Sequence, residues 1–361
     1  MKYEVLDSDK DLVKWKKTLS LLSDELQDIY FYPEYVGMHK FIKGTKSLLF
    51  TFKEEENIWL HPFLLQPIDS DAFSLNGGPW FDIESAYGYG GPLSNTEDKD
   101  FLDNANEQFS EWCMENNVVA EFVRFHPIIE NEKWASESHS IKQLKYTLSV
   151  KPEGREEHIY NNPKVRNRIK RAKKNNINVH KISIDQYFQS FVDIYHQNMR
   201  RVNADKHYHF NTKYFSELKK LVNKNGYLVG AIKDEELIGA SIFLFGKTNL
   251  HYHLSATGDQ CDIPGVSNSL IDAGIHICRK NTMNLLHLGG GNSNSENDNL
   301  YKFKKSMGNM EHTYSIGWKI HHLDIYNQLK DICSSKFSAS FEKHSDKILF
   351  YRLIQSQQKY I

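Results

Sequence analysis

The sequence lacks the features that mark several large classes of protein. No stretch of 18 or more residues is apolar throughout, so no membrane-spanning helix is predicted. The first ten residues are polar and contain no apolar core of the kind a secretory signal carries, which favours a cytoplasmic protein. The formal net charge is −1 over 361 residues. Overall charge therefore gives no support to DNA binding, and any polyanion site must be a local patch.

Cysteine is scarce, and its four copies show no CxxC spacing, so reduced thiols are expected rather than a disulfide framework. Histidine is frequent, with 17 copies. HxH pairs, such as His207 with His209 and His251 with His253, would place two imidazoles on one face of a strand, which suits zinc. Without a cysteine pair or an HExxH motif, we expect no metal. The competing interpretation of His253 is a polar side chain that lines a substrate site.

An internal repeat is the most informative feature that is present. Residues 48–65 align without gaps on residues 228–245, with seven of eighteen positions identical. Both segments have the pattern of a hairpin, in which two apolar strands flank an acidic turn. The alternative is two unrelated hairpins that share a common pattern.

The segments after each hairpin favour a true duplication. A helix over 100–116 and a strand over 118–125 follow the first hairpin. A strand over 250–254, a helix over 267–280 and a strand over 285–288 follow the second. The chain is therefore predicted to be α/β (α+β), with domains at 1–150 and 151–330 and a helical tail at 331–361 that packs on the body.

Residues 164–174 combine seven basic side chains with no acidic one, behind Pro163, a residue suited to a first helical turn. One interpretation is a solvated helix face. The other is an anion-binding helix, with Arg168 and Arg171 contacting the phosphates of a nucleotide sugar, a lipid pyrophosphate or tRNA.

Three loops offer exposed backbone to a ligand. Gly289, Gly290, Gly291 and Asn292 follow a predicted strand, and Tyr87, Tyr89, Gly90 and Gly91 form a similar run in the first half. Gly265, Val266, Ser267 and Asn268 begin a predicted helix, whose N-terminus attracts phosphate. The two glycine runs suggest a cleft between the halves.

At these motifs the sequence resembles the FemABX-like branch of the GNAT acyltransferase superfamily. The matching segments, in the family's order, are YGYGGPL at 87–93, RFHP at 124–127, NPKVRNRIKRAKKNNI at 162–177, YHLSAT at 252–257, HLGGG at 287–291 and DNLYKFKKSMG at 298–308. The resemblance implies two tandem GNAT-like domains, each a mixed, mainly antiparallel sheet flanked by helices. It extends from about residue 30 to residue 326.

The resemblance also implies an acyltransferase of cell-wall or polysaccharide biosynthesis. The acyl group, an acetyl group by preference, would come from acyl-CoA, held at Gly265 to Asn268, and pass to an amine of an amino-sugar or peptidyl precursor. The precursor is small or lipid-linked. The first alternative is transfer from aminoacyl-tRNA, although the long coiled-coil arm of many relatives is absent. The second is a non-catalytic protein that binds an anionic ligand. The apolar residues of the tail admit peripheral membrane contact as a minor alternative.

Two candidate catalytic residues follow from the same resemblance. Phe303 and Lys304 match a Phe-Lys pair of the peptidoglycan-type relatives, in which the lysine stabilises the oxyanion of the transition state. The general base stays open among Asp82, Glu84, His126 and His253, with proton relay by water as another route. Arg124 is expected to clamp an anionic group, and His126 is either a substrate contact or a structural residue. No GxSxG motif is present, so direct attack by the amine is preferred to a covalent enzyme intermediate.

Overall fold

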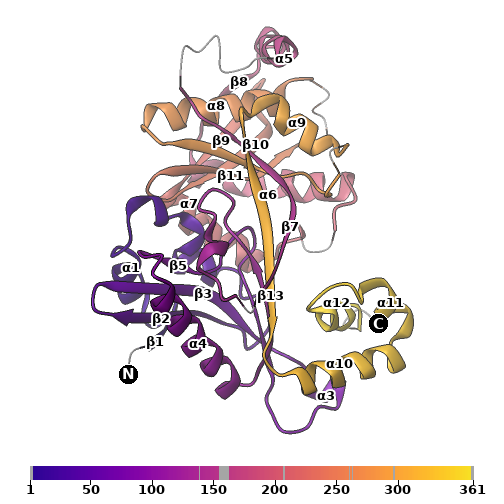
Figure 1. Cartoon of the computed structure of the whole chain (residues 1–361). Coiled ribbons are helices and arrows are strands. Elements are labelled where there is room, and N and C mark those ends of the chain that lie inside the picture. The colour runs from indigo at the N-terminus through magenta and orange to yellow at the C-terminus, as the bar shows by residue number, and fades with distance from the viewer. Residues whose placement is uncertain are drawn as a thin grey trace. The chain divides into compact units, whose positions relative to one another are not determined.

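The computed structural model describes residues 3–137, 139–153, 162–205, 208–259, 261, 263–295 and 297–358 (Figure 1). The chain divides into two compact units. Unit 1 comprises Met1–Leu26, Tyr30–Leu144 and Tyr314–Ile361, and unit 2 comprises Gln27–Ile29 and Lys145–Thr313. The expected domain limits at 150 and 330 therefore differ from the limits of these units, and the last strand and the tail helices cluster with unit 1.

Unit 1 is a mixed sheet with helices. Its elements are β1 (Tyr3–Asp7), α1 (Leu12–Leu19), α2 (Pro33–Gly37), β2 (Lys46–Glu54), β3 (Asn57–Pro67), α3 (Ser70–Phe73), β4 (Phe81–Glu84), β5 (Leu93–Ser94), α4 (Lys99–Glu115), β6 (Val118–Arg124), α10 (Leu323–Lys336), α11 (Ser338–His344) and α12 (Phe350–Gln358). The strands β1, β2, β3 and β4 pair antiparallel in that order, and β4 pairs parallel to β6.

Unit 2 repeats this plan. Its elements are α5 (Pro163–Lys174), β8 (Asn178–Lys181), α6 (Ile184–Arg201), α7 (Thr212–Asn225), β9 (Gly226–Lys233), β10 (Glu236–Phe245), β11 (Asn249–Thr257), α8 (Val266–Lys280), β12 (Leu285–Gly289) and α9 (Asn299–Met307). The strands β8, β9, β10 and β11 pair antiparallel in that order, and β11 pairs parallel to β12. The predicted duplication is thus present in the topology, with β2–β3 and β9–β10 as the two hairpins.

Two long strands run from one unit into the other, β7 (Ser140–Val150) and β13 (Met310–Ile320). In unit 1, Ile316 to Ile320 of β13 pair antiparallel with β6. In unit 2, Leu148 to Val150 of β7 pair antiparallel with β12. Each unit therefore completes its sheet with a strand from the other half of the sequence. This exchange explains why a boundary drawn by sequence order does not coincide with the units.

Local sequence accounts for the helices. Asp98 caps α4 by accepting a hydrogen bond of 2.8 Å from the Phe101 N–H, and Phe101, Phe109 and Trp112 are buried on its inner face as the apolar spacing predicts. The predicted start of α8 at residue 267 is one residue late. The helix begins at Val266, and Gly265 takes the cap position with φ of +102°, a conformation that favours glycine.

Each unit has its own hydrophobic core. In unit 2, buried residues of β7, β9, β11, β12, α8 and α9 form one cluster, and Val165 and Ala172 of α5 belong to it. In unit 1, a second cluster joins the tail to the sheet. Leu329 and Cys333 of α10 and Phe350 and Tyr351 of α12 pack in it with Phe73, Trp80, Val119 and Ala120. Among the described residues, no helix is long and apolar enough to cross a membrane.

Candidate functional site

The loop after β12 in unit 2 is shaped by its glycines and by Asp298. Gly289 ends the strand with φ of +74°, so an L-residue there would be strained. The Asp298 carboxylate caps α9 by accepting from the Tyr301 N–H at 2.8 Å, and its other oxygen accepts from the N–H groups of Asn292 and Ser293 at 3.1 Å. A Cβ on Gly291 would lie 2.5 Å from Asp298 Oδ1, so this position requires glycine. Asp298 therefore fixes the loop against the start of α9.

Lys304 of α9 points into this loop. Its side chain is buried, with the residue only 9% exposed, and its Nζ donates a hydrogen bond of 2.8 Å to the Gly290 carbonyl. Lys145 of β7 reaches the same loop, where its Nζ donates a hydrogen bond of 2.7 Å to the Gly291 carbonyl. Two ammonium groups thus bind neighbouring carbonyls of one glycine turn. Lys304 was expected here from the sequence, whereas Lys145 was missed because 146 positions separate it from Gly291.

Burial and, after it, the nearby positive charge of Lys145 lower the pKa of Lys304 to about 7, and Asp298 opposes both effects. Burial also lowers the pKa of Lys145, again opposed by Asp298. Burial works to raise the pKa of Asp298, but hydrogen bonds from Tyr301, Ser293 and Asn292 outweigh it and hold the pKa below its usual value. The pair of lysines therefore faces a single carboxylate among the described residues, and that carboxylate is already occupied by backbone donors.

The other residues predicted at this loop, Phe303 and Asn292, make a packing contact and a backbone hydrogen bond. Phe303 is partly buried and packs against the core of unit 2, so the structure gives it a packing contact beside Lys304. Asn292 contributes its backbone N–H to Asp298. On the same helix, Lys305 turns away toward Glu311 at 2.8 Å. Of the two adjacent lysines, only Lys304 belongs to the glycine loop.

The parallel strands β11 and β12 separate after a short paired region. They pair only from Asn249 to His251 against Leu285 to His287, although β11 continues to Thr257. Between them in sequence lies α8, at whose N-terminus the acyl-CoA pyrophosphate was expected. Here the backbone of the basic helix α5 lies against α8, since a Cβ on Gly265 would be 2.2 Å from the Arg168 carbonyl oxygen. Val266 and Asn268 are buried, and the Asn268 amide donates to Met307 Sδ at 3.2 Å. On the side of Gly265, the expected phosphate cradle is therefore occupied by the backbone of α5.

The helix α5 itself is confirmed. Val165 and Ala172 bury its apolar seam, while Lys164, Arg168, Lys170, Arg171, Lys173 and Lys174 are exposed. No ion pair of these six side chains occurs within the described residues. The sequence pattern of a cationic outer face is thus present in the structure.

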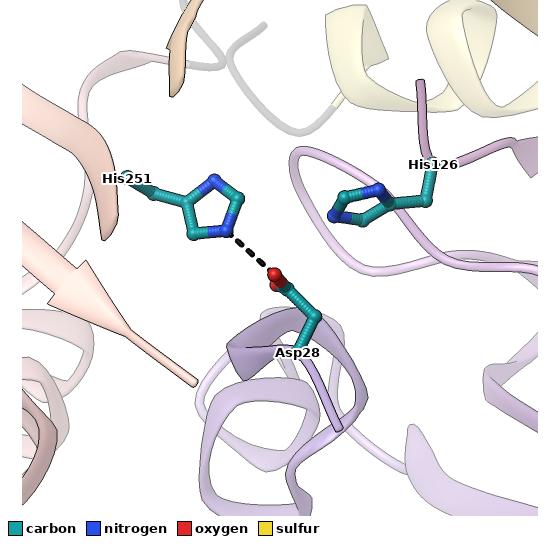
Figure 2. Close-up of side chains that lie close together, drawn as sticks. All are labelled: Asp28, His126 and His251. Atoms are coloured by element: carbon teal, nitrogen blue, oxygen red, sulfur yellow. Dashed lines mark hydrogen bonds and ion pairs between the residues drawn. The ribbon is translucent and has the colours of Figure 1, made fainter. Parts of the chain in front are cut away.

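His251 of β11 and Asp28 form a buried carboxylate–imidazole pair. His251 points toward Asp28, and its Nε2 donates a hydrogen bond of 2.8 Å to Asp28 Oδ2 (Figure 2). His251 pairs in register with His287, whose Nε2 contacts the Thr147 hydroxyl at 3.0 Å. His253 lies two residues further on, with its Nε2 2.9 Å from the Tyr214 hydroxyl of α7. These contacts give His251 and His253 hydrogen-bonding partners in unit 2, and His207 of the other HxH pair lies outside the described residues.

In unit 1, Arg124 and Glu84 form an ion pair of 2.5 Å. The Arg124 guanidinium also donates to the Ser85 carbonyl and lies 4.9 Å from the centre of the Phe122 ring, and Gln66 donates to Glu84 at 3.1 Å. Burial works to raise the pKa of Glu84, but Arg124 and Gln66 hold it below its usual value. A general base of lowered pKa is weak, so this geometry favours Glu84 as the partner of Arg124.

The first glycine run is a packed turn. Asn131 donates to the carbonyls of Gly90 and Pro92 at 2.8 and 2.9 Å, and Gly91 has φ of +95°. The Tyr35 hydroxyl donates to the Tyr87 carbonyl at 2.8 Å, and the Tyr89 ring meets that of His126 edge-on. His126 is buried, with Nδ1 accepting from the N–H groups of Ile128 and Ile129 at 3.3 Å. These contacts within unit 1 account for the conformation of the glycine run at 87–92.

Asp82 anchors the tail. It is fully buried, and Arg352 of α12 donates to its Oδ2 at 2.7 Å and to the carbonyls of Pro67 and Gln66 at 2.8 and 2.9 Å. Burial raises the pKa of Asp82 to about 6, and Arg352 opposes this effect. This environment favours a structural role, whereas the sequence left Asp82 open as a general base.

A buried cluster in unit 1 escaped the sequence patterns. The Glu121 carboxylate of β6 is fully buried and bonds the His139 ring, with His321 Nε2 at 3.9 Å. Burial works to raise the pKa of Glu121, but His139 and His321 hold it well below its usual value. Burial also lowers the pKa of the neighbouring His61 to about 4. Its members lie in β3, in β6 and directly next to β7 and β13, so no local sequence spacing predicts the cluster.

Comparison with known proteins clarifies the fold. No family model matches the sequence, and a search of curated proteins finds no match. Among solved structures, FemX aligns over 91% of this chain and 99% of its own, with a TM-score of 0.66 and 10% identity. The chain has a FemX-like fold. This confirms the expected fold class, two units built from mixed sheets and helices.

Two further structures share this FemX-like fold at lower similarity. L-PGS from Bacillus licheniformis aligns over 87% of this chain and 92% of its own, with a TM-score of 0.55 and 9% identity. The C-terminal domain of a protein assigned as a lysylphosphatidylglycerol synthetase from Agrobacterium fabrum aligns over 88% and 95%, with a TM-score of 0.55 and 10% identity. At such identity the likeness establishes the fold, and the reaction is a separate question.

Proposed function

We propose that the protein is an N-acyltransferase that acylates an amine of a cell-envelope or glycan precursor. The observation that carries the proposal is Lys304, a buried ammonium group held at 2.8 Å from the Gly290 carbonyl in a glycine turn. The turn lies directly after β12, one of the two parallel strands that separate in unit 2. The FemX-like fold and the Phe-Lys motif support the same assignment.

In the proposed reaction, the neutral amine attacks the acyl carbonyl carbon, and a tetrahedral intermediate with an oxyanion forms. The Lys304 ammonium donates a hydrogen bond to this oxyanion, which a buried cation stabilises more strongly than an exposed one would. The C–N bond is then complete, the bond to the donor's leaving group breaks, and the amine proton passes to water or to the leaving group. No side chain is assigned as the general base.

The position of α5 supports one donor over the other. Its backbone lies against Gly265, which leaves little room for a pyrophosphate at the N-terminus of α8. Its outer face presents six exposed cations, the pattern that neutralises a polynucleotide backbone. We therefore propose aminoacyl-tRNA as the donor, with Arg168 and Arg171 as phosphate contacts. Acyl-CoA is the second candidate, because an acyl-CoA chain could enter where β11 and β12 separate.

Two binding measurements on the full chain separate these donors. Calorimetric titration with acetyl-CoA is expected to show no heat, and filter binding of charged tRNA is expected to show an affinity that falls with salt. Replacing Arg168, Arg171 and Lys174 by alanine should weaken tRNA binding by roughly tenfold or more, because phosphates that the helix no longer neutralises keep their bound counterions.

The matched control replaces Lys213, Lys220 and Lys224 of α7, three exposed lysines on another helix. Equal affinity of the α5 variant and the parent at low salt rejects the role of α5. Tight acetyl-CoA binding would select acyl-CoA as the donor. If neither donor gives product and Lys304→Met alters only the affinity for an anion, the protein is a binding module rather than a transferase.

A further inference from the structure

Lys145 and Lys304 form a two-cation cluster that the proposed acyl transfer uses only in part. Their Nζ atoms donate to the adjacent carbonyls of Gly291 and Gly290 at 2.7 and 2.8 Å. An ammonium group has three donors, and among the described residues each of these groups gives one of them to a carbonyl. Two donors on each lysine therefore have no protein acceptor among the described residues.

The charges around the cluster do not balance. Asp298 is the carboxylate that faces it from the start of α9, and its two oxygens already accept from backbone N–H groups of the loop and helix. Glu311 of β13 lies beside α9, but it pairs with Lys305 at 2.8 Å and accepts from the Tyr301 hydroxyl. Within the described part of the chain, two cations thus share one engaged carboxylate. A buried positive charge of this kind is stabilised by an anion.

We infer that Lys145, Lys304 and the Gly290–Gly291 turn form an oxyanion-binding site, which holds a phosphate or carboxylate group of the substrate. Such a group presents two oxygens, one for each ammonium. The inference rests on the proposed function for the identity of the substrate, although anion binding itself needs no acyl transfer. Lys145 and Lys304 each supply donors to the anion, and Lys304 takes up a proton when the anion binds.

Proton uptake is the specific signature of this site. Because the pKa of free Lys304 is lowered to about 7, this group is largely neutral at pH 8. A bound anion favours the charged form and raises the pKa, so binding at pH 8 should draw protons from the buffer. Calorimetric titrations with sodium phosphate in two buffers of different ionisation enthalpy measure this uptake. Sodium acetate at the same ionic strength tests the carboxylate alternative.

Three variants of the full chain decide the assignment. Lys145→Met and Lys304→Met are each expected to weaken phosphate binding by roughly tenfold to a hundredfold, the range for one charge-assisted hydrogen bond. Lys304→Met should also abolish the proton uptake. Lys305→Met is the control, since this lysine is the sequence neighbour of Lys304 but pairs with Glu311. Thermal unfolding and circular dichroism of each variant establish that it is folded, and Lys145→Arg should restore most of the binding.

The outcomes are distinct. Phosphate binding that is lost equally in Lys305→Met, or unchanged in both Lys145→Met and Lys304→Met, overturns the site. Binding without proton uptake at pH 8 overturns the role of Lys304 in it. If no donor supports acyl transfer while phosphate binding depends on both lysines, the anion site stands and the proposed function falls. If acyl transfer proceeds and phosphate binding does not depend on either lysine, the proposed function stands and the anion site is rejected.

Discussion

Asp82 and Arg352 lie 270 positions apart in the sequence, yet the Arg352 Nε donates to Asp82 Oδ2 at 2.7 Å in the core of unit 1. The carboxylate is fully buried, and the arginine side chain is 11% exposed. The same guanidinium donates to the carbonyls of Pro67 and Gln66. One side chain of α12 therefore satisfies three acceptors of β3 and β4, and the tail belongs to the folded unit.

Arg352→Ala is expected to lower the free energy of unfolding by about 3 kcal/mol, because it leaves a buried carboxylate without its counterion. Urea unfolding at pH 7 measures the loss. The control is Lys347→Ala, which removes an exposed partner of Asp346 and should change stability by less than about 1 kcal/mol. A loss no larger than that of the control would contradict the anchoring role of Arg352.

The same variant has a predicted pH dependence. The folded-state pKa of Asp82 is about 6, above the ordinary value of 3.8. The folded state therefore keeps this proton longer than the unfolded state does, and the contribution of Asp82 to stability falls as pH rises from about 4 to about 6. A protonated Asp82 needs no counterion, so the cost of Arg352→Ala should shrink at pH 5 relative to pH 7. An equal cost at both pH values would contradict this interpretation.

Glu121→Gln should destabilise unit 1 by about 3 kcal/mol at pH 7, because His139 and His321 lose their buried anionic partner. The folded-state pKa of Glu121 lies well below that of the unfolded chain, so its stabilising contribution is complete above the unfolded pKa and is lost as pH falls. Urea unfolding from pH 7 to below pH 4 should therefore show an unchanged difference down to the unfolded-state pKa and the parent approaching the variant only below it. Glu115→Gln, an exposed site at the end of α4, serves as the control and should leave stability unchanged.

The sequence predicted the parts of the fold that depend on local periodicity. The hairpins at 48–65 and 228–245, the basic helix α5 and the buried face of α4 were all confirmed, because strand alternation and helical spacing are set by neighbouring residues. The Phe-Lys motif led to Lys304 through family resemblance. Its burial and its bond to the Gly290 carbonyl depend on packing that no local pattern encodes.

The features that were missed all join distant segments. Lys145 reaches Gly291, His251 reaches Asp28 and Arg352 reaches Asp82 across 146, 223 and 270 positions. The sequence also did not predict that β7 pairs with β12 and β13 with β6. Local sequence does not specify this exchange, because either strand could have paired within its own half of the chain. For the glycine run at 87–92, the sequence suggested a ligand loop, whereas Asn131 and Tyr35 hold it in a packed turn.

Gly291→Ala and Gly290→Ala test whether the glycine loop is built around Asp298. A Cβ at 291 would lie 2.5 Å from Asp298 Oδ1 and 2.9 Å from Tyr301 Cβ, so the cap of α9 must shift. A Cβ at 290 would meet its nearest atom, the Tyr146 carbonyl oxygen, at 3.3 Å. We expect Gly291→Ala to cost about 2 kcal/mol in urea unfolding and Gly290→Ala less than half of that. The reverse order would show that the loop does not depend on the Asp298 cap.

The pH profile of acyl transfer reports the state of Lys304. The pKa of Lys304 is about 7 in the free protein and is raised by the bound anion, so the turnover of the bound complex should decline at a pH above 7, where the stabilising cation is lost. Lys304→Arg keeps the charge at all these pH values and should flatten the decline. A rate that rises through pH 7 in the parent but not in Lys304→Arg would instead assign Lys304 as a general base.

The most direct test of the central claim is mass analysis of envelope precursors from a deletion strain complemented with the parent, Lys304→Met or Lys305→Met. We predict that the deletion strain accumulates a precursor lighter by one acyl group. The parent and Lys305→Met should restore the mass, while Lys304→Met, expressed at the same level, should lower the initial rate of restoration by roughly a hundredfold or more. Full restoration by Lys304→Met, or identical precursors with and without the protein, would contradict acyl transfer at this lysine.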